Sequence, residues 1–229
     1  MSGSGAKRVL VTGGSRGIGL ATAQAFLEEG ARVAICARDP VRLEAVAEGL
    51  GAQGEIFAQA LDIRDASQVV SFVDACAERW GGLDVLVNNA GVLWTGPYAE
   101  QDYASIDTVI DSNVKGVMYA ARAVLPHMLR AARGTIINIS SGAGLTGFPE
   151  LAAYSSSKFA VVGFTESLDQ EVGHQGIRVF GLCPGRVATD MQRELSGAKI
   201  GMAPARIAAR IVELAAESSR APTGRCLTL

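Results

Sequence analysis

Short apolar runs alternate with longer segments of helical period along the chain. The apolar runs are rich in β-branched residues and show no clean apolar/polar alternation, which is typical of strands buried on both faces. They predict seven strands, at residues 8–12, 32–36, 55–60, 84–89, 135–140, 178–183 and 225–229. The intervening segments predict helices at residues 17–29, 40–50, 66–80, 102–131, 152–173 and 204–217.

This alternation predicts an α/β fold, because each parallel strand pair needs a crossover connection that a helix can supply. We expect a Rossmann-like, doubly wound, mostly parallel seven-stranded sheet with helices on both faces. Since we find no linker and no internal repeat, residues 1–229 are expected to form a single domain. In such a sheet the ligand site lies at the carboxyl ends of the strands.

Composition narrows the class of protein. A chain of 229 residues with 48% apolar residues suits one large core. The net charge is -2 and no block of like charges occurs, so we expect no nucleic-acid or membrane partner. The four cysteines are far apart without a C-x-x-C pair, so no metal site is expected. Without an 18-residue apolar run or a signal-peptide core, we expect a cytoplasmic protein.

A glycine-rich turn follows the first predicted strand in VLVTGGSRGIGLATA. Gly13, Gly14, Gly17 and Gly19 would let the backbone turn tightly and approach a pyrophosphate at the positive end of the next helix. Any tight strand-to-helix turn can use such glycines, so the motif alone is a weak signal. Its position after the first strand of a βαβ unit favours nucleotide binding.

Three further motifs end predicted strands: NNAG at 88–91, NISSGAG with Ser140 and Ser141, and LCPGRVATD with Pro184 and Gly185. Each could be ordinary turn or capping chemistry when taken alone.

Tyr154 and Lys158 lie four positions apart in AAYSSSKFAV, so on a helix both point to the same side. This pair alone is equally explained by a tyrosine ring that packs inward beside a lysine that extends to solvent.

Together the motifs resemble the short-chain dehydrogenase/reductase family in its single-domain branch. The resemblance rests on TGGSRGIG at 12–19, NNAG at 88–91, the spacing of Ser141 thirteen positions before Tyr154, and the Tyr154-x-x-x-Lys158 pair. It covers residues 7 to about 190 strongly and the last forty residues weakly. It implies a catalytic tetrad at Asn113, Ser141, Tyr154 and Lys158.

The resemblance further implies a dinucleotide-binding and catalytic domain that transfers a hydride between NADP(H) and a carbonyl or alcohol substrate. Asp62 would hold the adenine amino group, and Thr189 would contact the carboxamide. The implied cofactor-binding residues are Gly13, Ser15, Arg16, Gly17, Ile18, Gly19, Arg38, Asp62, Ile63, Asn89, Ala90, Gly91, Tyr154, Lys158, Pro184, Gly185, Val187 and Thr189.

The family resemblance also implies a homodimer or homotetramer, with the helices at 102–131 and 152–173 as the interface. The alternative function is a non-catalytic NADP(H)-sensing binding protein of the same fold, which would need the glycine turn but could dispense with Tyr154 and Lys158.

The end of the second predicted strand bears on the choice of cofactor. Proteins that prefer NAD place a carboxylate there for the ribose hydroxyls, whereas this chain has Ala37 and Arg38. Arg38 and Arg16 could bind a 2′-phosphate through charged hydrogen bonds. We therefore expect NADP(H) to be preferred, with NAD(H) possible. Asp39 favours the alternative, that both arginines are solvated surface charges.

A free tyrosine has a pKa near 10 and relays protons poorly at neutral pH. We expect the Lys158 ammonium to bring the pKa of Tyr154 near neutrality, because at about 4 Å it would stabilise the tyrosinate by roughly 4 kcal/mol.

The substrate itself is not identified by the sequence. The residues that could line its pocket are mostly apolar and could equally be core: Leu93, Trp94, Tyr98, Gly142, Leu145, Phe148, Leu151, Met191 and Leu195. The short stretch between Thr189 and Pro204 predicts a short lid and an open pocket.

Overall fold

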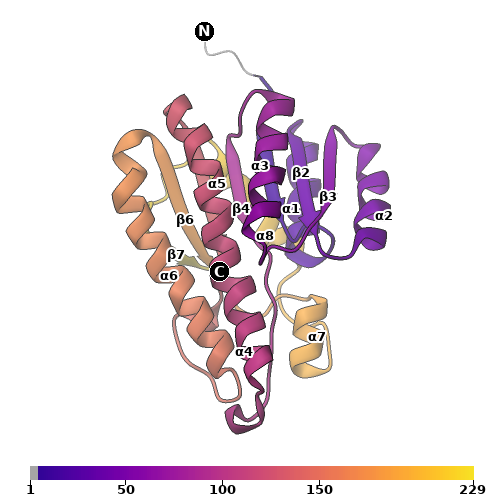
Figure 1. Cartoon of the computed structure of the whole chain (residues 1–229), viewed down its shortest axis with the longest axis vertical. Helices are drawn as coiled ribbons and strands as arrows, with labels where there is room; N and C mark the ends of the chain where they lie inside the picture. Colours follow the sequence, from indigo (N-terminus) through magenta and orange to yellow (C-terminus); the bar gives the residue numbers. More distant parts are fainter. Residues whose placement is uncertain (1–4) are drawn as a thin grey trace.

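A seven-stranded sheet runs through the centre of the protein (Figure 1). The computed structural model describes residues 5–229, so residues 1–4 of the predicted domain lie outside the described residues. The strand order is β3-β2-β1-β4-β5-β6-β7, and every neighbouring pair is parallel. The strands are β1 Arg8–Thr12, β2 Arg32–Ala37, β3 Ile56–Ala60, β4 Val85–Asn88, β5 Gly134–Ile139, β6 Ile177–Cys183 and β7 Cys226–Thr228.

Helices cover both faces of this sheet (Figure 1). They are α1 Gly17–Glu28, α2 Pro40–Gly51, α3 Ala66–Trp80, α4 Tyr103–Ile110, α5 Gly116–Ala131, α6 Ala152–Val172, α7 Asp190–Ser196 and α8 Pro204–Ala215. Side chains fix several starting points, because Asp39, Asp65 and Asp102 accept hydrogen bonds from the first backbone N–H groups of α2, α3 and α4.

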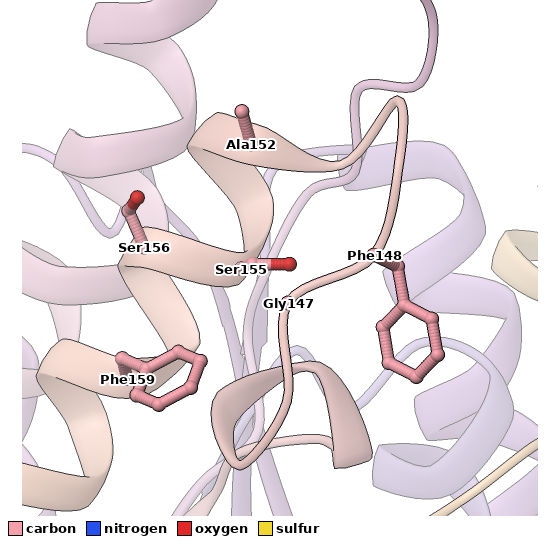
Figure 2. Close-up of a pocket in the computed structure, with 6 residues that line it drawn as sticks. All are labelled: Gly147, Phe148, Ala152, Ser155, Ser156 and Phe159. Carbon is pink, nitrogen blue, oxygen red and sulfur yellow. The ribbon is translucent and has the colours of Figure 1, made fainter.

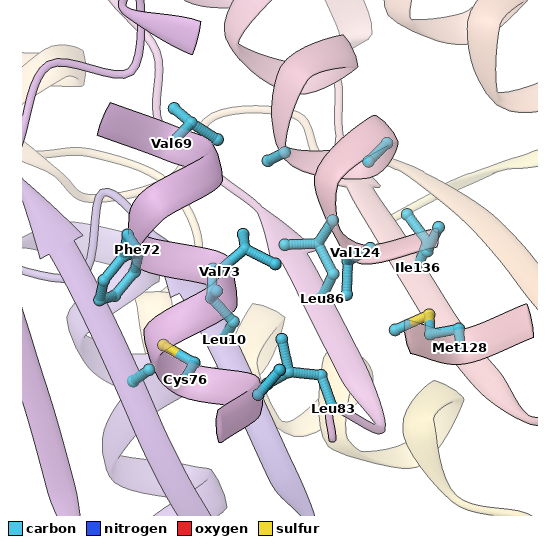
Figure 3. Packing of buried hydrophobic residues seen from close by; sticks show 14 of the residues in the cluster. Leu10, Val69, Phe72, Val73, Cys76, Leu83, Leu86, Val124, Met128 and Ile136 are labelled. Atoms are coloured by element: carbon cyan, nitrogen blue, oxygen red, sulfur yellow. The ribbon is translucent and has the colours of Figure 1, made fainter. Parts of the chain in front are cut away.

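Alternate side chains of the strands point to opposite faces of the sheet, where they form two separate hydrophobic cores. Leu10, Leu86 and Ile136 pack with α3, α5 and α6 on one face, as Figure 3 shows. Val9 and Ile137 point the other way and pack with α1, α2 and α8. Because both faces are covered, the central strands are mostly apolar and show no regular alternation with polar residues.

The structure corrects the prediction of one continuous helix at 102–131. A π turn, Asp111–Lys115, separates α4 from α5. In this turn the Asn113 side chain binds the backbone of Val92 at both its N–H and its C=O. A single π turn leaves the apolar periodicity on either side intact, so the sequence pattern gives no sign of it.

The second correction concerns the segment after β6, which contains the unpredicted helix α7. Thr189 caps its start by accepting from Gln192 N, and Gly197 ends it with φ of 76°. Its 7 residues are too few to give a periodic apolar signal. Within residues 5–229, no helix combines the length and the apolar character needed to cross a membrane.

Candidate active site

A cleft with a volume of about 830 Å³ lies at the edge of the sheet where the strands end. It brings together motifs that are far apart in the sequence. The predicted site residues that line it are Gly13, Ser15, Arg16, Gly17, Ile18, Arg38, Ile63, Asn89, Ala90, Gly91, Ser141, Tyr154, Lys158, Pro184, Gly185, Val187 and Thr189. The predicted residues Gly19, Asp62 and Asn113 are not among the lining residues.

The glycine turn packs so tightly at Gly13 and Gly19 that neither position has room for a side chain. Gly13 and Gly17 have positive φ of 68° and 57°. A Cβ on Gly13 would lie 2.9 Å from the Cα of Ala90, and one on Gly19 would collide with the Gly13 carbonyl. Gly19 therefore supports the cleft from behind. No side chain caps the start of α1 among the described residues, so its first N–H groups remain available to an anion.

Hydrogen bonds of Asn89 and Thr12 hold this turn against the end of β4. The Asn89 Nδ2 donates to the carbonyls of Thr12 and Gly13, at 2.9 and 3.1 Å. The backbone N–H groups of Asn89 and Ala90 both donate to Thr12 Oγ1 at 3.0 Å. Thr12 was not among the predicted site residues, although it opens the TGGSRGIG motif that could have revealed it.

Tyr154 and Lys158 project from α6 into the cleft and are almost fully buried, at 8% and 5% exposure. Lys158 Nζ donates to the Ile139 carbonyl at 3.0 Å and lies 5.7 Å from the centre of the Tyr154 ring. Ser141, two residues after β5, lines the same cleft, and its side chain is near enough to Tyr154 to lower the pKa of the phenol. The structure thus brings three members of the predicted tetrad to one point.

The expected fall in the pKa of Tyr154 is wrong for this structure. Burial raises the pKa of Tyr154 above its ordinary value, and the nearby Ser141 side chain offsets only part of this effect. Burial also lowers the pKa of Lys158 to about 8. Tyr154 therefore keeps its proton at neutral pH, which suits a proton donor.

Asn113 lies behind these side chains and is fully buried in the π turn. Its Oδ1 accepts from Val92 N at 2.8 Å, and its Nδ2 donates to Val92 O and to Ser157 Oγ at 2.9 and 3.0 Å. Ser157 Oγ in turn donates to the Tyr154 carbonyl at 2.7 Å. This chain of bonds ties α6 to the segment after β4. Ser157 was missed because a serine inside a helix carries no distinctive signal.

Three arginines line the cleft near the end of β2. They are Arg16, Arg38 and Arg42, of which Arg42 was not predicted. Asp39 accepts from Arg42 N at 3.1 Å, so its carboxylate is engaged in capping α2. Asp62, expected to bind adenine, pairs with Arg64 at 2.6 Å. That hydrogen bond lowers the pKa of Asp62.

The opposite end of the cleft is largely apolar. Of the nine candidate pocket residues, those that line the cleft are Leu93, Gly142, Phe148, Leu151, Met191 and Leu195. Trp94, Tyr98 and Leu145 do not line it. Met191 and Leu195 come from α7, so the stretch between Thr189 and Pro204 contains a short helix whose two apolar side chains line the cleft. The sequence predicted a short lid there but not this helix.

A second hollow, of about 570 Å³, lies beside α6 and is shown in Figure 2. Phe148 and Phe159 flank it and are 51% and 46% exposed. Tyr154 and Lys158 do not line it, although Phe148 lines both this hollow and the large cleft.

The residues of the large cleft fit a dinucleotide. The glycine turn and the uncapped start of α1 can receive a pyrophosphate. Arginines line the same cleft on one side of this turn, and Ser141 and Tyr154 line it as well. Within residues 5–229, no group of three or more His, Cys, Asp or Glu side chains is placed to hold a metal ion.

Comparison with sequence families gives a match to the model described as short chain dehydrogenase, over residues 7–199. The 3-oxoacyl-(acyl-carrier-protein) reductase FabG of Staphylococcus aureus (strain Mu50 / ATCC 700699) is 40% identical over 192 residues, which cover 83% of this chain and 78% of the relative. The 2-(S)-hydroxypropyl-CoM dehydrogenase 3 of Xanthobacter autotrophicus is 37% identical over 200 residues, covering 82% of this chain and 75% of the relative.

Solved structures are also similar to this chain. A variant of actinorhodin polyketide ketoreductase with NADPH has a TM-score of 0.92 and 32% identity, covering 98% of this chain and 95% of that one. ElxO with NADP bound has a TM-score of 0.88 and 30% identity, covering 98% and 97%.

Proposed function

Because the chain belongs to the short chain dehydrogenase family of oxidoreductases, we propose that it transfers a hydride between NADP(H) and a carbonyl or alcohol substrate. One observation carries this proposal. Ser141, Tyr154 and Lys158 line the same cleft as the glycine turn, and the tyrosine and lysine are almost fully buried there. Such an arrangement supports a role for Tyr154 as a proton donor beside a bound dinucleotide.

When bound, the nicotinamide supplies the hydride. The protein supplies orientation and a proton. The Ser141 hydroxyl, close to Tyr154, binds the carbonyl oxygen of the substrate and stabilises the charge that develops there. Tyr154 donates its phenolic proton to that oxygen.

Lys158 favours the tyrosinate that forms, because its ammonium lies beneath the Tyr154 ring. We propose that it also binds the ribose next to the nicotinamide. Asn113 acts through its neighbours as a positioning residue, since its side chain joins Val92 to Ser157 and so fixes the start of α6.

We propose a preference for NADP(H) over NAD(H). Arg16 and Arg38 line the cleft near the end of β2, where a carboxylate would repel a 2′-phosphate. Arg42 adds a third positive charge, and Asp39 is engaged by α2. The two named relatives with bound cofactor, the actinorhodin ketoreductase and ElxO, were solved with NADPH and NADP.

A non-catalytic NADP(H)-sensing protein is the second candidate function. It is disfavoured because a protein that only binds the cofactor could dispense with the buried Tyr154 hydroxyl beside Ser141.

A homo-oligomer is also proposed, with α5 and α6 as the interface. Met118 and Leu129 on α5 and Phe159 on α6 are large apolar side chains with 37–46% of their surface exposed. Burying them against a second copy would remove this apolar surface from water.

The proposed function is tested by the oxidation of NADPH, followed by absorbance, with a panel of ketones, diketones and aldehydes. A blank without a carbonyl compound measures background oxidation. Carbonyl-dependent oxidation of NADPH supports an enzyme. NADPH binding with no turnover on the whole panel would instead favour the sensing protein.

A further inference from the structure

Arg186 adds a positive charge to the cleft, and it takes no part in the proposed proton transfer or in binding the 2′-phosphate. It follows Pro184 and Gly185 at the end of β6, and it lines the same cleft as Ser141 and Tyr154. No ion pair among residues 5–229 includes Arg186.

The backbone of Arg186 is fixed on both sides. Its carbonyl accepts from Met202 N at 2.9 Å, which closes the base of the lid. Two residues earlier, the Pro184 carbonyl accepts from Gly142 N at 2.9 Å, directly after Ser141. The guanidinium is therefore carried by a segment whose position relative to the proposed catalytic serine is set by hydrogen bonds.

The carboxylates near this segment do not neutralise Arg186. Asp190, which also lines the cleft, pairs with Lys199 at 2.8 Å and with Arg193 at 3.3 Å. These ion pairs lower the pKa of Asp190, with Lys199 as the largest cause. Among the described residues Arg186 is thus a positive charge without an ion-pair partner, in the same cleft as Leu93, Met191 and Leu195.

We propose that Arg186 determines substrate specificity, and that the substrate is a carbonyl compound with an apolar body and an anionic group, carboxylate or phosphate. A guanidinium binds either group through paired, charged hydrogen bonds. The apolar side chains of the lid would contact the body of the substrate. This inference rests on the proposed function, because it assumes that the substrate carbonyl binds at Ser141 and Tyr154.

The carboxylate is tested with a stable keto acid, 4-oxo-4-phenylbutanoate, against its neutral methyl ester. Wild-type protein should reduce the acid with at least about tenfold higher kcat/KM. Arg186→Leu should lower kcat/KM for the acid about tenfold and change the value for the ester less than about threefold. The kcat/KM of Arg186→Lys for the acid should lie between those of wild-type protein and Arg186→Leu. Lysine keeps the positive charge but cannot donate the paired hydrogen bonds of a guanidinium. Arg206→Leu, an exposed arginine of α8 outside the cleft, is the matched control and should change neither.

The phosphate is tested with acetoacetyl-pantetheine and its 4′-phosphate. A ratio in favour of the phosphate ester that disappears in Arg186→Leu would identify a phosphate-bearing substrate. If the ratio disappears only for the keto acid pair, the anionic group is a carboxylate. If Arg186→Leu lowers both members of each pair equally, Arg186 does not recognise an anion and the inference is overturned.

Binding measurements separate this inference from the proposed function. Calorimetry should show that Arg186→Leu weakens binding of the acid about tenfold, while the Kd of NADPH stays within about twofold. An unchanged Kd for the acid overturns the role of Arg186 even if no compound turns over. A tenfold weaker NADPH complex with an unchanged acid-to-ester ratio would assign Arg186 to the cofactor. Reduction of neutral ketones that does not depend on Arg186 would leave the proposed function in place.

Discussion

Tyr154 and Lys158 are displaced from their ordinary pKa values by the same cause, because both are almost fully buried. Burial disfavours the charged form of each group, so the pKa of the phenol rises and that of the ammonium falls. Lys158, at about 8, thus titrates close to the physiological range. The spacing of the two residues predicts that they share one side of α6. Their burial depends on tertiary packing, which cannot be predicted from that spacing.

The pKa of Lys158 predicts how reduction depends on pH. Lys158 is charged below about pH 8 and neutral above it. If the ammonium supports proton transfer from Tyr154, kcat/KM for carbonyl reduction should be constant at lower pH and fall as the pH rises through about 8. Lys158→Met should have a lower kcat/KM, and its kcat/KM should no longer fall as the pH rises through about 8. A wild-type profile that stays flat from about pH 7 to about 9.5 would contradict the role of Lys158.

Arg38 is predicted to set the cofactor preference. Arg38→Asp should reduce the ratio of kcat/KM for NADPH to that for NADH at least about tenfold, because a carboxylate would face the 2′-phosphate. The effect should be larger at low salt, since the side chain is partly exposed. Arg206→Asp serves as the control for a charge change outside the cleft. Equal use of NADH and NADPH by wild-type protein would refute the preference.

At the scale of elements, the sequence predicted all seven strands, with end points within one residue. Apolar runs that must be buried on both faces leave a strong signal. The π turn at Asp111–Lys115 and the helix α7 were not predicted. The π turn keeps the helical period on either side, and α7 is too short to have one. Asn113 could be found by resemblance, whereas its bonds to Val92 and Ser157 needed the structure.

The glycine turn gives a prediction about this element. Gly19→Ala would place a Cβ against the Gly13 carbonyl and the Asn89 side chain. We expect a loss of about 1–3 kcal/mol in the free energy of unfolding and at least about tenfold weaker NADPH binding by fluorescence titration. Gly49→Ala, in α2 with open space around it, is the matched control and should be neutral or slightly stabilising. Unchanged NADPH affinity in Gly19→Ala would mean that the turn is not the pyrophosphate site.

For the whole molecule, the two cores and the covered faces of the sheet leave one group of large apolar side chains on α5 and α6 without a partner among the described residues. These helices lie side by side on the face that α3 also covers (Figure 1). Resemblance pointed to the same two helices. Which side chains remain exposed could be learned only from the structure, because the small residues Ala120 and Ala121 of α5 are buried against the sheet.

The oligomer is predicted to depend on this face. Light scattering at micromolar concentration should give a mass well above the 23.8 kDa of one chain. Phe159→Glu should shift the protein toward the monomer, because it places a charge in an apolar interface. Val41→Glu, on α2 and 77% exposed, is the control and should leave the mass unchanged. Wild-type protein that is a monomer under these conditions would refute the interface.

Tyr154→Phe decides whether Tyr154 donates a proton to a substrate carbonyl beside a bound NADPH. The variant removes the phenolic oxygen and leaves the glycine turn untouched. Kinetics with an active ketone should show kcat at least about a hundredfold lower, while the Kd of NADPH, measured by fluorescence titration, stays within a few fold. A variant that retains more than about a tenth of the wild-type kcat would contradict the account.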